Sequence, residues 1–380
     1  MARLGDVCAK ITDGSHNPPQ GISCSEYLML SSKNIYDDDI SFDDPRYLSK
    51  ENYETENKRT QISAGDILLT IVGTVGRAAV VSKTEKKICL QRSVAVIKPK
   101  QELIDSRFLM YQLQSMRTHL EQEARGVAQK GIYLRQVENL QIKVPSRGEQ
   151  LQVVSNLDQI SELISLRKQQ LAKLDELVKS RFIELFGDQK ANPFGWPQTT
   201  IGDCCTLKSG TSLPADKENE GGRIPYVKVG DMNYPGNEQY ITTSSRFVTE
   251  QTAGAGIFPV GTVIFPKRGG AIGTNKKRLT TLPICADLNV MGVTAGNALK
   301  SQYLMAYFNL VDLGALDNGS SVPQINNKDI APLVICLPPL ALQEQFAAFV
   351  EQTDKSKLAI QESLAELETL KKALMQKYFG

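Results

Sequence analysis

Histidine, tryptophan and an excess of one charge are all scarce in this chain of 380 residues. It has two histidines (His16 and His119), one tryptophan, and a formal net charge of +2 from 44 basic and 42 acidic residues. Two histidines leave little from which to build a histidine-rich metal site or a histidine-activated nucleophile. The near-balanced charge excludes a histone-like polycation, so any contact with nucleic acid must come from local clusters of cations.

Cysteine pairs and long apolar runs are also missing. The seven cysteines include no Cys-x-x-Cys spacing, and Cys204 and Cys205 are adjacent. Together with the lack of a secretory signal after Met1, this pattern predicts reduced thiols and a cytoplasmic protein. No apolar run is long enough to span a membrane. The content of 41% hydrophobic and 23% charged residues is typical of a globular protein, and the length predicts two or more domains.

Catalytic signatures are absent or weak. There is no Gly-Lys-Ser/Thr, so no P-loop. Asn17-Pro18-Pro19-Gln20 resembles an amino-methyltransferase motif but lacks the aromatic residue that stacks on a flipped base. Asp66 with Glu85-x-Lys87 has the spacing of one nuclease metal site, which is a weak signal without a counterpart in the second half. We therefore predict that the chain is not an enzyme and has no catalytic residue, metal or cofactor of its own.

Two long stretches, 149–186 and 344–379, contain neither proline nor glycine. Each begins with a Glu-Gln pair, at Glu149-Gln150 and Glu344-Gln345, and each is followed by a glycine. An uninterrupted stretch of this length predicts a single helix of about 50 Å, and a trailing glycine is a helix-stop signal. The sequence therefore predicts two unusually long helices of matched length.

Apolar residues in both stretches recur at alternating steps of three and four, which is the spacing of a coiled-coil seam. The predicted seam residues are Leu157, Ile160, Ile164, Leu171, Leu174, Val178, Ile360, Leu364, Leu367 and Leu374. Two matched copies in one chain predict that the helices pair with each other. The alternative is that each long amphipathic helix packs separately on a globular core.

The segments before the two helices resemble each other, with an offset that stays within a few residues of 195. Leu4-Gly5-Asp6 matches Ile201-Gly202-Asp203, and Gly73-Thr74-Val75-Gly76 matches Gly270-Ala271-Ile272-Gly273. Several matches in the same order indicate a tandem duplication. The predicted segments are a globular domain at 1–145, a long helix at 146–187, a second globular domain at 188–337 and a second long helix at 338–380.

Each globular segment combines β-rich runs of four to eight residues with helical stretches, as in Asp66–Val72 and Asp105–Arg125. We therefore predict an α+β, or mixed α/β, fold in tandem duplication. If a pseudo-twofold axis relates the halves, the long helices form an antiparallel coiled coil and the arrangement is nearly cyclic. Gly380 is then expected to lie near Met1.

Glycine turns flanked by cations occur at matching places in both halves. Glycine lets a backbone approach a phosphate closely, and nearby cations neutralise it. The predicted DNA-binding residues are Lys33, Arg59, Gly73, Thr74, Arg77, Lys83, Arg92, Lys228, Lys267, Arg268, Gly270, Asn275, Lys276, Lys277, Arg278, Asn326 and Lys328. The alternative is a solvated surface loop, which is what most Lys-Lys-Arg turns are. The stretches 13–20, 208–212 and 226–233 are further candidates for reading bases, because they are loop-like and differ between the halves.

The order of domain, long helix, domain, long helix resembles the specificity (S) subunit of Type I restriction–modification systems. The likeness rests on short motifs that include Ile224–Asp231, Gly269–Gly273, Val322–Asn326 and Leu337–Leu340. The stretch 126–133 departs from the pattern, because it replaces a more usual Gly-Ser-x-x-Pro type of run.

The resemblance implies a non-catalytic subunit in which two target recognition domains each read one half of a bipartite, asymmetric double-stranded DNA site. The coiled coil would set the spacer and dock two methyltransferase (modification) subunits, which restriction/translocase subunits then join. The methyl donor and ATP are then expected on those partner subunits. The competing hypothesis is a coiled-coil protein–protein scaffold without DNA recognition.

Overall fold

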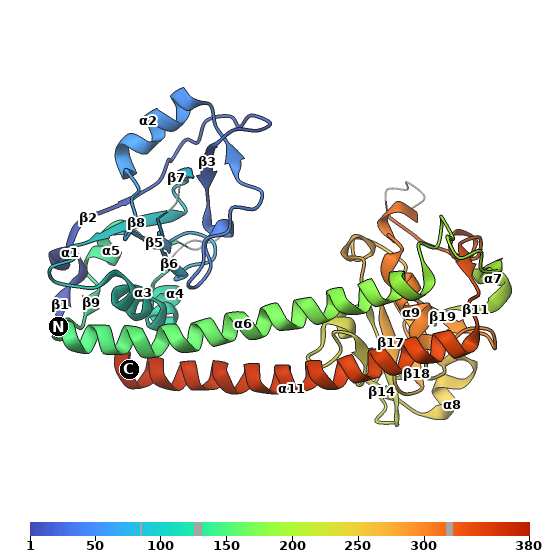
Figure 1. The fold of residues 1–380 in the computed structure, drawn as a ribbon. Coiled ribbons are helices and arrows are strands. Elements are labelled where there is room, and N and C mark those ends of the chain that lie inside the picture. Colours follow the sequence, from blue (N-terminus) through green and yellow to red (C-terminus); the bar gives the residue numbers. More distant parts are fainter. Residues whose placement is uncertain (84–85, 125–130, 317–321) are drawn as a thin grey trace. The chain divides into compact units, whose positions relative to one another are not determined.

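The fold is described from a computed structural model of the 380-residue chain, in which residues 1–83, 86–124, 131–316 and 322–380 are described. Two compact units can be distinguished (Figure 1): unit 1 comprises Met1–Gln169 and Gln361–Gly380, and unit 2 comprises Gln170–Ile360. Each unit contains one globular domain and a part of the two long helices, α6 (Arg147–Phe186) and α11 (Leu340–Phe379), which have 40 residues each. The predicted α+β duplication with two long helices is confirmed.

The described part of unit 1 contains three small sheets. The largest is antiparallel, in the order β2 (Cys8–Asp13), β8 (Val94–Pro99), β5 (Ile67–Thr70) and β6 (Ala78–Val80). The second has the order β4 (Arg46–Tyr47), β3 (Tyr27–Leu30) and β7 (Lys87–Leu90), with β3 and β7 parallel. The third pairs β1 (Ala2–Arg3) with β9 (Gln141–Ile142). The helices are α1 (Leu4–Val7), the 3₁₀ turn η1 (Ser32–Asn34), α2 (Lys50–Thr60), α3 (Ser106–Ser115), α4 (Arg117–Glu123) and α5 (Leu134–Glu138).

Unit 2 repeats this plan. Its largest sheet has the order β11 (Cys205–Ser209), β19 (Val290–Ala295), β16 (Thr262–Pro266), β17 (Arg278–Thr280) and β13 (Tyr240–Ile241). The next has the order β14 (Phe247–Val248), β12 (Ile224–Val227), β18 (Ile284–Ala286) and β15 (Ile257–Phe258), with β12 and β18 parallel. The third pairs β10 (Gln198–Thr200) with β20 (Val334–Cys336). The helices are α7 (Ile201–Cys204), η2 (Val229–Asn233), α8 (Glu250–Ala253), η3 (Gly254–Gly256), η4 (Ile272–Thr274), α9 (Ser301–Leu310), η5 (Gly314–Leu316) and α10 (Asn327–Ile330).

One buried glutamine fastens the start of each long helix to its globular domain. In α6, Gln150 accepts from the amide of Asp105 (2.7 Å) and donates to the carbonyls of Leu103 (3.1 Å) and Pro145 (2.9 Å). Its side chain thereby satisfies backbone groups that helix starts and tight connections leave open.

Gln343 makes the same three bonds in α11. It accepts from the amide of Lys300 (2.8 Å) and donates to the carbonyls of Ala298 (3.0 Å) and Pro338 (2.9 Å). The counterpart of Gln150 is therefore Gln343 and not Gln345, which the repeated Glu-Gln pair suggested.

Within each unit the two long helices run antiparallel. In unit 1, Asn156 donates to the Tyr378 hydroxyl (2.8 Å), and Lys168 pairs with Glu368 (3.2 Å). The partner number falls as the α6 number rises, which fixes the antiparallel direction. In unit 2, Asp175 pairs with Lys357 (2.6 Å), and Phe182 contacts Phe346 with ring centres 5.5 Å apart.

The predicted seam residues lie on the shielded side of these helices. Leu157 and Ile160 are buried. The rest are half-buried among exposed neighbours: Ile164, Leu171, Leu174, Val178, Ile360, Leu364, Leu367 and Leu374. A narrow stripe of this kind is typical of a two-helix contact, whereas packing on a broad core buries a wider face.

The chain end lies beside its beginning in unit 1 (Figure 1). Lys143 donates to the carbonyl of Gly380 (3.1 Å), and the neighbouring Ile142 pairs with Ala2 in the β1–β9 ladder. This is the proximity of Gly380 to Met1 that the sequence predicts. No helix in the described residues is both long enough and apolar enough to cross a membrane.

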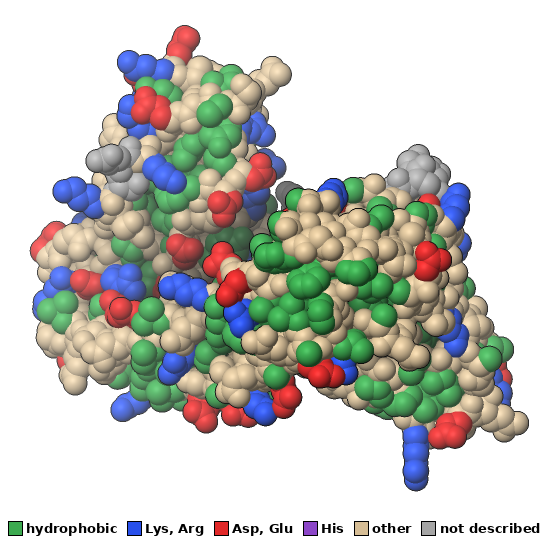
Figure 2. All heavy atoms as spheres, turned by 45° about the vertical axis from the view of Figure 1, so that its right-hand side comes forward, with side chains coloured by type: hydrophobic (Ala, Val, Ile, Leu, Met, Phe, Trp, Pro, Cys, Tyr) green, Lys and Arg blue, Asp and Glu red, His purple; other side chains and the backbone are tan. Residues whose placement is uncertain are grey.

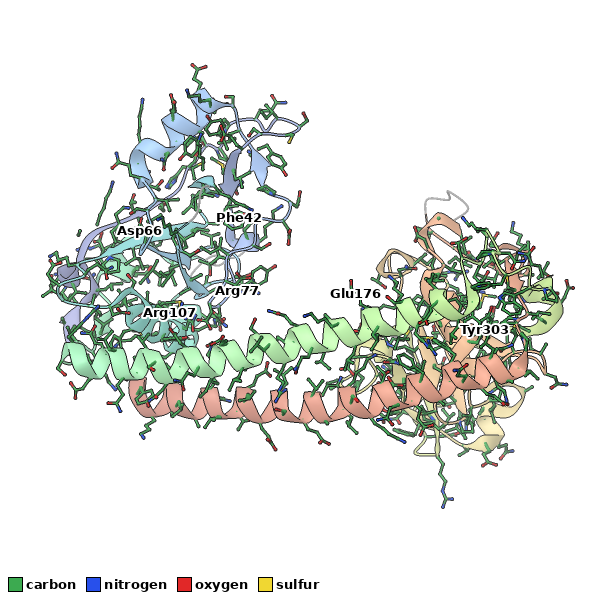
Figure 3. All side chains as sticks on the ribbon, viewed as in Figure 1. Phe42, Asp66, Arg77, Arg107, Glu176 and Tyr303 are labelled. Atoms are coloured by element: carbon green, nitrogen blue, oxygen red, sulfur yellow. The ribbon has the colours of Figure 1, made fainter. Side chains whose placement is uncertain are left out.

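Four fully buried aromatic rings pack the globular domain of unit 2 against the long helices. They are Phe182, Phe186, Tyr303 and Phe346. The ring centres of Phe346 and Phe186 are 5.5 Å apart, and those of Phe186 and Tyr303 are 4.7 Å apart. Figure 3 labels Tyr303 in this cluster. Aromatic pairs at these distances stabilise beyond their buried area.

We predict that Phe346→Ala lowers the free energy of unfolding of unit 2 by about 3–5 kcal/mol, because it leaves a cavity among these rings. The measurement is urea unfolding followed by the fluorescence of Trp196, the only tryptophan, whose indole donates to the Phe186 carbonyl (3.2 Å). Leu358→Ala is the matched control, since Leu358 is 57% exposed on the same helix. Equal losses in the two variants would contradict this account of the core.

Candidate nucleic-acid interface

Loops from five parts of unit 1 meet where the parallel strands β3 and β7 end. The amide of Gly14 donates to the Val94 carbonyl (3.2 Å), and that of Ser15 donates to the Leu90 carbonyl (2.7 Å). The amide of Ile71 donates to the Ser93 carbonyl (2.9 Å). We call the loops that these main-chain bonds connect, together with residues 131–133, the loop frame.

The loop frame closes on the segment before α5. Ile132 donates to the Ile71 carbonyl (2.9 Å), and Val72 pairs with Gly131 in an isolated antiparallel bridge. The 3₁₀ turn η1, which follows β3, is attached to the same set of loops. Its Ser32 amide donates to the Ser93 hydroxyl (3.1 Å). Loops held at the carboxyl ends of parallel strands are a common place for binding sites.

Unit 2 contains the same loop frame, and its residues have numbers about 196 higher than their counterparts in unit 1. Gly210 donates to the Val290 carbonyl (2.9 Å), and Thr211 donates to the Ala286 carbonyl (2.8 Å). Lys267 donates to the Asn289 carbonyl (2.9 Å).

The closing contacts are repeated as well, at an offset of 193 for the last segment. Ile325 donates to the Lys267 carbonyl (2.9 Å), and Arg268 pairs with Gln324 as Val72 pairs with Gly131. The turn glycines are Gly73 (φ +82°) and Gly269 (φ +76°). Gly73 therefore corresponds to Gly269, one residue before the Gly270 that the sequence alignment matched.

Gly14 and Gly210 are required by the frame itself. A Cβ on Gly14 would lie 2.1 Å from the Leu90 carbonyl oxygen, and one on Gly210 would lie 2.1 Å from the Asp287 carbonyl oxygen. Both distances are far inside van der Waals contact with backbone, so no side chain fits. The 196-residue offset between these glycines was the sequence signal for the frame, and sequence reasoning did not use it.

Three of the predicted residues of unit 1 lie exposed on this frame: Gly73, Thr74 and Arg92. Lys33 lies there too, in η1, but its amine pairs with Asp44 (2.5 Å). Lys83 is exposed in the connection between β6 and β7.

Two predicted cations of unit 1 have internal partners. Arg59, in α2, pairs with the buried Asp13 and donates to the Thr12 hydroxyl (3.2 Å). Arg77 is half-buried; its guanidinium lies 5.1 Å from the centre of the Tyr36 ring and donates to the Ile35 carbonyl (3.5 Å). These contacts tie loops together, so both side chains are structural in this conformation.

In unit 2 the frame carries Lys267, Arg268, Gly270, Asn326 and Lys328. The Lys267 amine donates to the Ser209 hydroxyl (2.9 Å). Burial lowers the pKa of Lys267, and the positive charge of Arg268 lowers it further. A lysine whose pKa is lowered by a neighbouring positive charge is stabilised in its charged form by a bound anion. Gly270, Arg268 and Lys328 are exposed.

In the second basic cluster of unit 2, at 275–278, Lys277 and Arg278 are engaged by groups inside the domain, so the prediction that they bind DNA gains no support from the structure. Lys277 is only 4% exposed, and its amine donates to Asn275 Oδ1 (2.7 Å) and the Val311 carbonyl (2.6 Å). Arg278 donates to the carbonyls of Asn237, Lys277 (2.8 Å) and Met232 (3.0 Å). These side chains donate to loop carbonyls that have no other partner described above. Because Lys277 is buried and Arg278 half-buried, their charges are shielded from solvent.

Their neighbours in the sequence have partners as well. Asn275 Oδ1 also accepts from the Leu313 amide (2.9 Å), and the half-buried Lys276 donates to Asn233. Lys228 forms an ion pair with Glu218 (2.6 Å).

Sequence reasoning missed Tyr133, which occupies the position of Asn326 in unit 1. Its side chain is 71% exposed at the start of α5, beside the Val72–Gly131 bridge. The two glycine-rich stretches at 126–133 and 319–329 lie partly outside the described residues, and only 131–133 and 322–329 are described.

The weak catalytic patterns gain no support. Asp66, labelled in Figure 3, is buried, pairs with Lys98 (2.5 Å) and accepts from Ser63 (2.8 Å), while Glu85 lies outside the described residues. In the described part of the chain, no three histidine, cysteine, aspartate or glutamate side chains gather as metal ligands.

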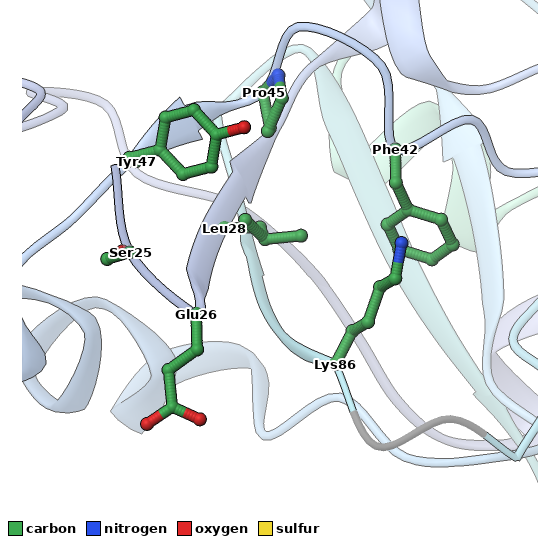
Figure 4. Close-up of a pocket in the computed structure, with 7 residues that line it drawn as sticks. All are labelled: Ser25, Glu26, Leu28, Phe42, Pro45, Tyr47 and Lys86. Atoms are coloured by element: carbon green, nitrogen blue, oxygen red, sulfur yellow. The ribbon is translucent and has the colours of Figure 1, made fainter. Parts of the chain in front are cut away.

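A pocket of about 350 Å³ lies at the opposite end of β3 from the loop frame (Figure 4). Its lining residues are Ser25, Glu26, Leu28, Phe42, Pro45, Tyr47 and Lys86. The two charged members are Glu26, which pairs with Lys87 (3.1 Å), and Lys86, which lies 3.9 Å from the centre of the Phe42 ring. The described lining of this pocket therefore does not offer two facing titratable groups for general acid–base catalysis.

Basic and acidic side chains are both scattered over the face shown in Figure 2, in keeping with the net charge of +2.

The profile of the Type I restriction modification DNA specificity domain matches residues 3–176 and again residues 193–370. The chain belongs to this family. Each match contains one copy of the loop frame, so the globular domain of each unit belongs to one specificity domain. The resemblance inferred from the repeated motifs is confirmed.

Specificity subunits are also among the relatives that this chain resembles in sequence. A segment of 158 residues is 32% identical to the Type I restriction enzyme EcoBI specificity subunit of Escherichia coli, covering 40% of this chain and 33% of that relative. Over 340 residues the chain is 23% identical to the MjaIX specificity subunit of Methanocaldococcus jannaschii, covering 82% and 76%.

Two solved structures share the fold. The Type I restriction–modification S subunit from M. genitalium has a TM-score of 0.57 at 15% identity, and covers 100% of this chain and 95% of its own. A structure from work on complex assembly and conformational transition of the type I R–M system has a TM-score of 0.55 at 20% identity, covering 100% and 96%.

We predict that Gly210→Ala destabilises the specificity domain of unit 2 by at least about 1–3 kcal/mol, because the added methyl displaces backbone. Hydrogen exchange of the Thr211 amide should accelerate, since that amide donates across the frame. The control is Gly270→Ala, where a Cβ meets nothing within 4 Å. Unchanged protection of Thr211 in Gly210→Ala would refute the steric argument.

We predict that Lys277→Met alters the pH dependence of stability. Burial lowers the pKa of Lys277 to about 8 from an unfolded value of 10.5. The unfolded state therefore binds more protons between these values, so this residue makes stability rise with pH there. The measurement is the difference in unfolding free energy between wild type and variant at pH 7 and pH 9.5. A difference that is constant with pH would contradict the burial of this amine.

Proposed function

We propose that this chain is the DNA-reading subunit of a Type I restriction–modification enzyme, with no catalytic step of its own. Each specificity domain reads one half of a bipartite double-stranded DNA site through its loop frame, and the paired helices set the spacer between the half-sites. The observation that carries this proposal is a main-chain frame built twice with different exposed side chains. Two identical domains would recognise two identical half-sites. Because the exposed side chains of the two frames differ, the two half-sites are expected to differ in sequence.

The residues proposed to meet DNA lie on the frame, with Lys83 added from the connection between β6 and β7. In unit 1 they are Gly73, Thr74, Lys83, Arg92 and Tyr133, all exposed; in unit 2 they are the exposed Arg268, Gly270 and Lys328 and the half-buried Lys267 and Asn326. The cations supply sequence-independent attraction to phosphates, and the glycine turns allow the backbone to come close.

The proposed partners are two methyltransferase subunits, joined by restriction/translocase subunits that bring ATP, while the methyl donor binds the methyltransferases. The long helices support this proposal, because they also expose large apolar side chains outside the predicted seam. Leu163 and Leu166 are 44% and 46% exposed, and Leu177 is 48% exposed. Apolar side chains repeated along an open helix face are typical of a helix-packing surface for a partner. The complex is proposed to act in the cytoplasm.

The test is a genome-wide map of methylated bases in a host that carries the chain with its modification subunit, compared with the same host lacking the chain. We expect a split, asymmetric motif that disappears with the chain and returns with the wild-type gene. A Gly14→Ala, Gly210→Ala double variant should fail to restore it, because both frames are then displaced. A motif unaffected by loss of the chain would overturn the proposal and favour the scaffold.

A further inference from the structure

Three matched positions of the loop frame carry opposite chemistry in the two domains. In unit 2 they are Arg268, Gln324 and Asn326. In unit 1 the same register places Val72, Gly131 and Tyr133 there. The main chain is alike, so the contrast lies in the side chains alone.

The three side chains of unit 2 form a hydrogen-bonded chain. Arg268 donates to Gln324 Oε1 (3.5 Å), and Gln324 Nε2 donates to Asn326 Oδ1 (2.8 Å). The Asn326 backbone amide is already satisfied by Asp329 Oδ2 (2.8 Å).

This arrangement directs hydrogen-bond donors outward. Gln324 uses both its oxygen and its nitrogen within the chain, so it orients its neighbours. Arg268 is exposed, and in the described residues no carboxylate pairs with it, so most of its five donors face solvent. Asn326 has its oxygen occupied, which leaves its amide hydrogens to donate.

We propose that Arg268 and Asn326 read guanine in the half-site of unit 2, and that Gln324 is the positioning residue. This inference rests on the proposed function. Guanine presents two acceptors, N7 and O6, in the major groove, and a guanidinium donates to both at once. Adenine presents one acceptor beside a donor, so two outward donors match guanine better.

Unit 1 is the internal contrast. Val72 and Gly131 have no polar side-chain atom, and Tyr133 presents an exposed ring with one hydroxyl. Apolar and aromatic groups in a groove contact the thymine methyl or the face of an unstacked base. The same positions in unit 1 therefore do not call for guanine.

The experiment begins with selection from a randomised 40-base-pair duplex library by the purified full-length chain, which gives the wild-type motif. Arg268→Ala is then expected to lose discrimination at one guanine of one half-site, by roughly 5- to 150-fold. Asn326→Ala should relax the same or an adjacent position, and Gln324→Met should relax it by less. Tyr133→Ala should change only the other half-site.

A chemical probe makes the contact specific. Replacing the selected guanine with 7-deazaguanine removes its N7 acceptor, so wild-type binding should weaken, whereas Arg268→Ala binding should not weaken further. Lys355→Ala, which removes one exposed cation from α11, is the charge-matched control and should leave the motif unchanged. Trp196 fluorescence during urea unfolding verifies that each variant remains folded.

The outcomes separate the two levels of the proposal. A wild-type chain that selects no motif would overturn the proposed function, and the assignment with it. A wild-type motif that is unchanged in Arg268→Ala and Asn326→Ala, or that has no guanine in the half-site they affect, would overturn the assignment alone. Uniform weakening across all sequences would also overturn it, because it would make Arg268 a phosphate contact.

Discussion

The attachment of each specificity domain to the start of its long helix depends on one buried glutamine amide. Gln150 and Gln343 each bond three backbone groups that lie on both sides of the junction. A single side chain that satisfies one donor and two acceptors leaves the junction few alternatives, because any rotation would bury unpaired backbone groups at a cost of about 1–3 kcal/mol each. A domain that reads DNA needs such a fixed base, since a displaced loop edge meets different base pairs.

The loop frame applies the same principle at the other side of the domain. Its bonds are main chain to main chain, and its tightest points are Gly14 and Gly210, where no side chain fits. The geometry is therefore independent of the residues that it displays. This independence lets Val72, Gly131 and Tyr133 replace Arg268, Gln324 and Asn326 without a change of backbone, so specificity can diverge between two copies of one fold.

The sequence predicted the features that depend on local pattern. The long helices follow from stretches without proline or glycine, and the shielded stripe that contains Leu157 and Leu374 follows from heptad spacing. The basic cluster at 275–278 shows the limit of such reasoning, because a run of cations says nothing about burial. Lys277 lies inside because the Val311 carbonyl and Asn275 need its donors. The role of Gly14 was equally hidden, because only the folded chain brings Leu90 against it.

The ion pairs of each domain determine which of the predicted cations remain available to a ligand. Arg59, Lys33 and Lys228 are neutralised by Asp13, Asp44 and Glu218. A few of the predicted cations remain without a carboxylate partner in the described residues, among them Arg92, Arg268 and Lys328. Because non-specific affinity grows with the number of phosphates neutralised, these exposed cations are the ones available to attract DNA at the frame. The proposed discrimination between sequences then comes from the side chains that the frame displays.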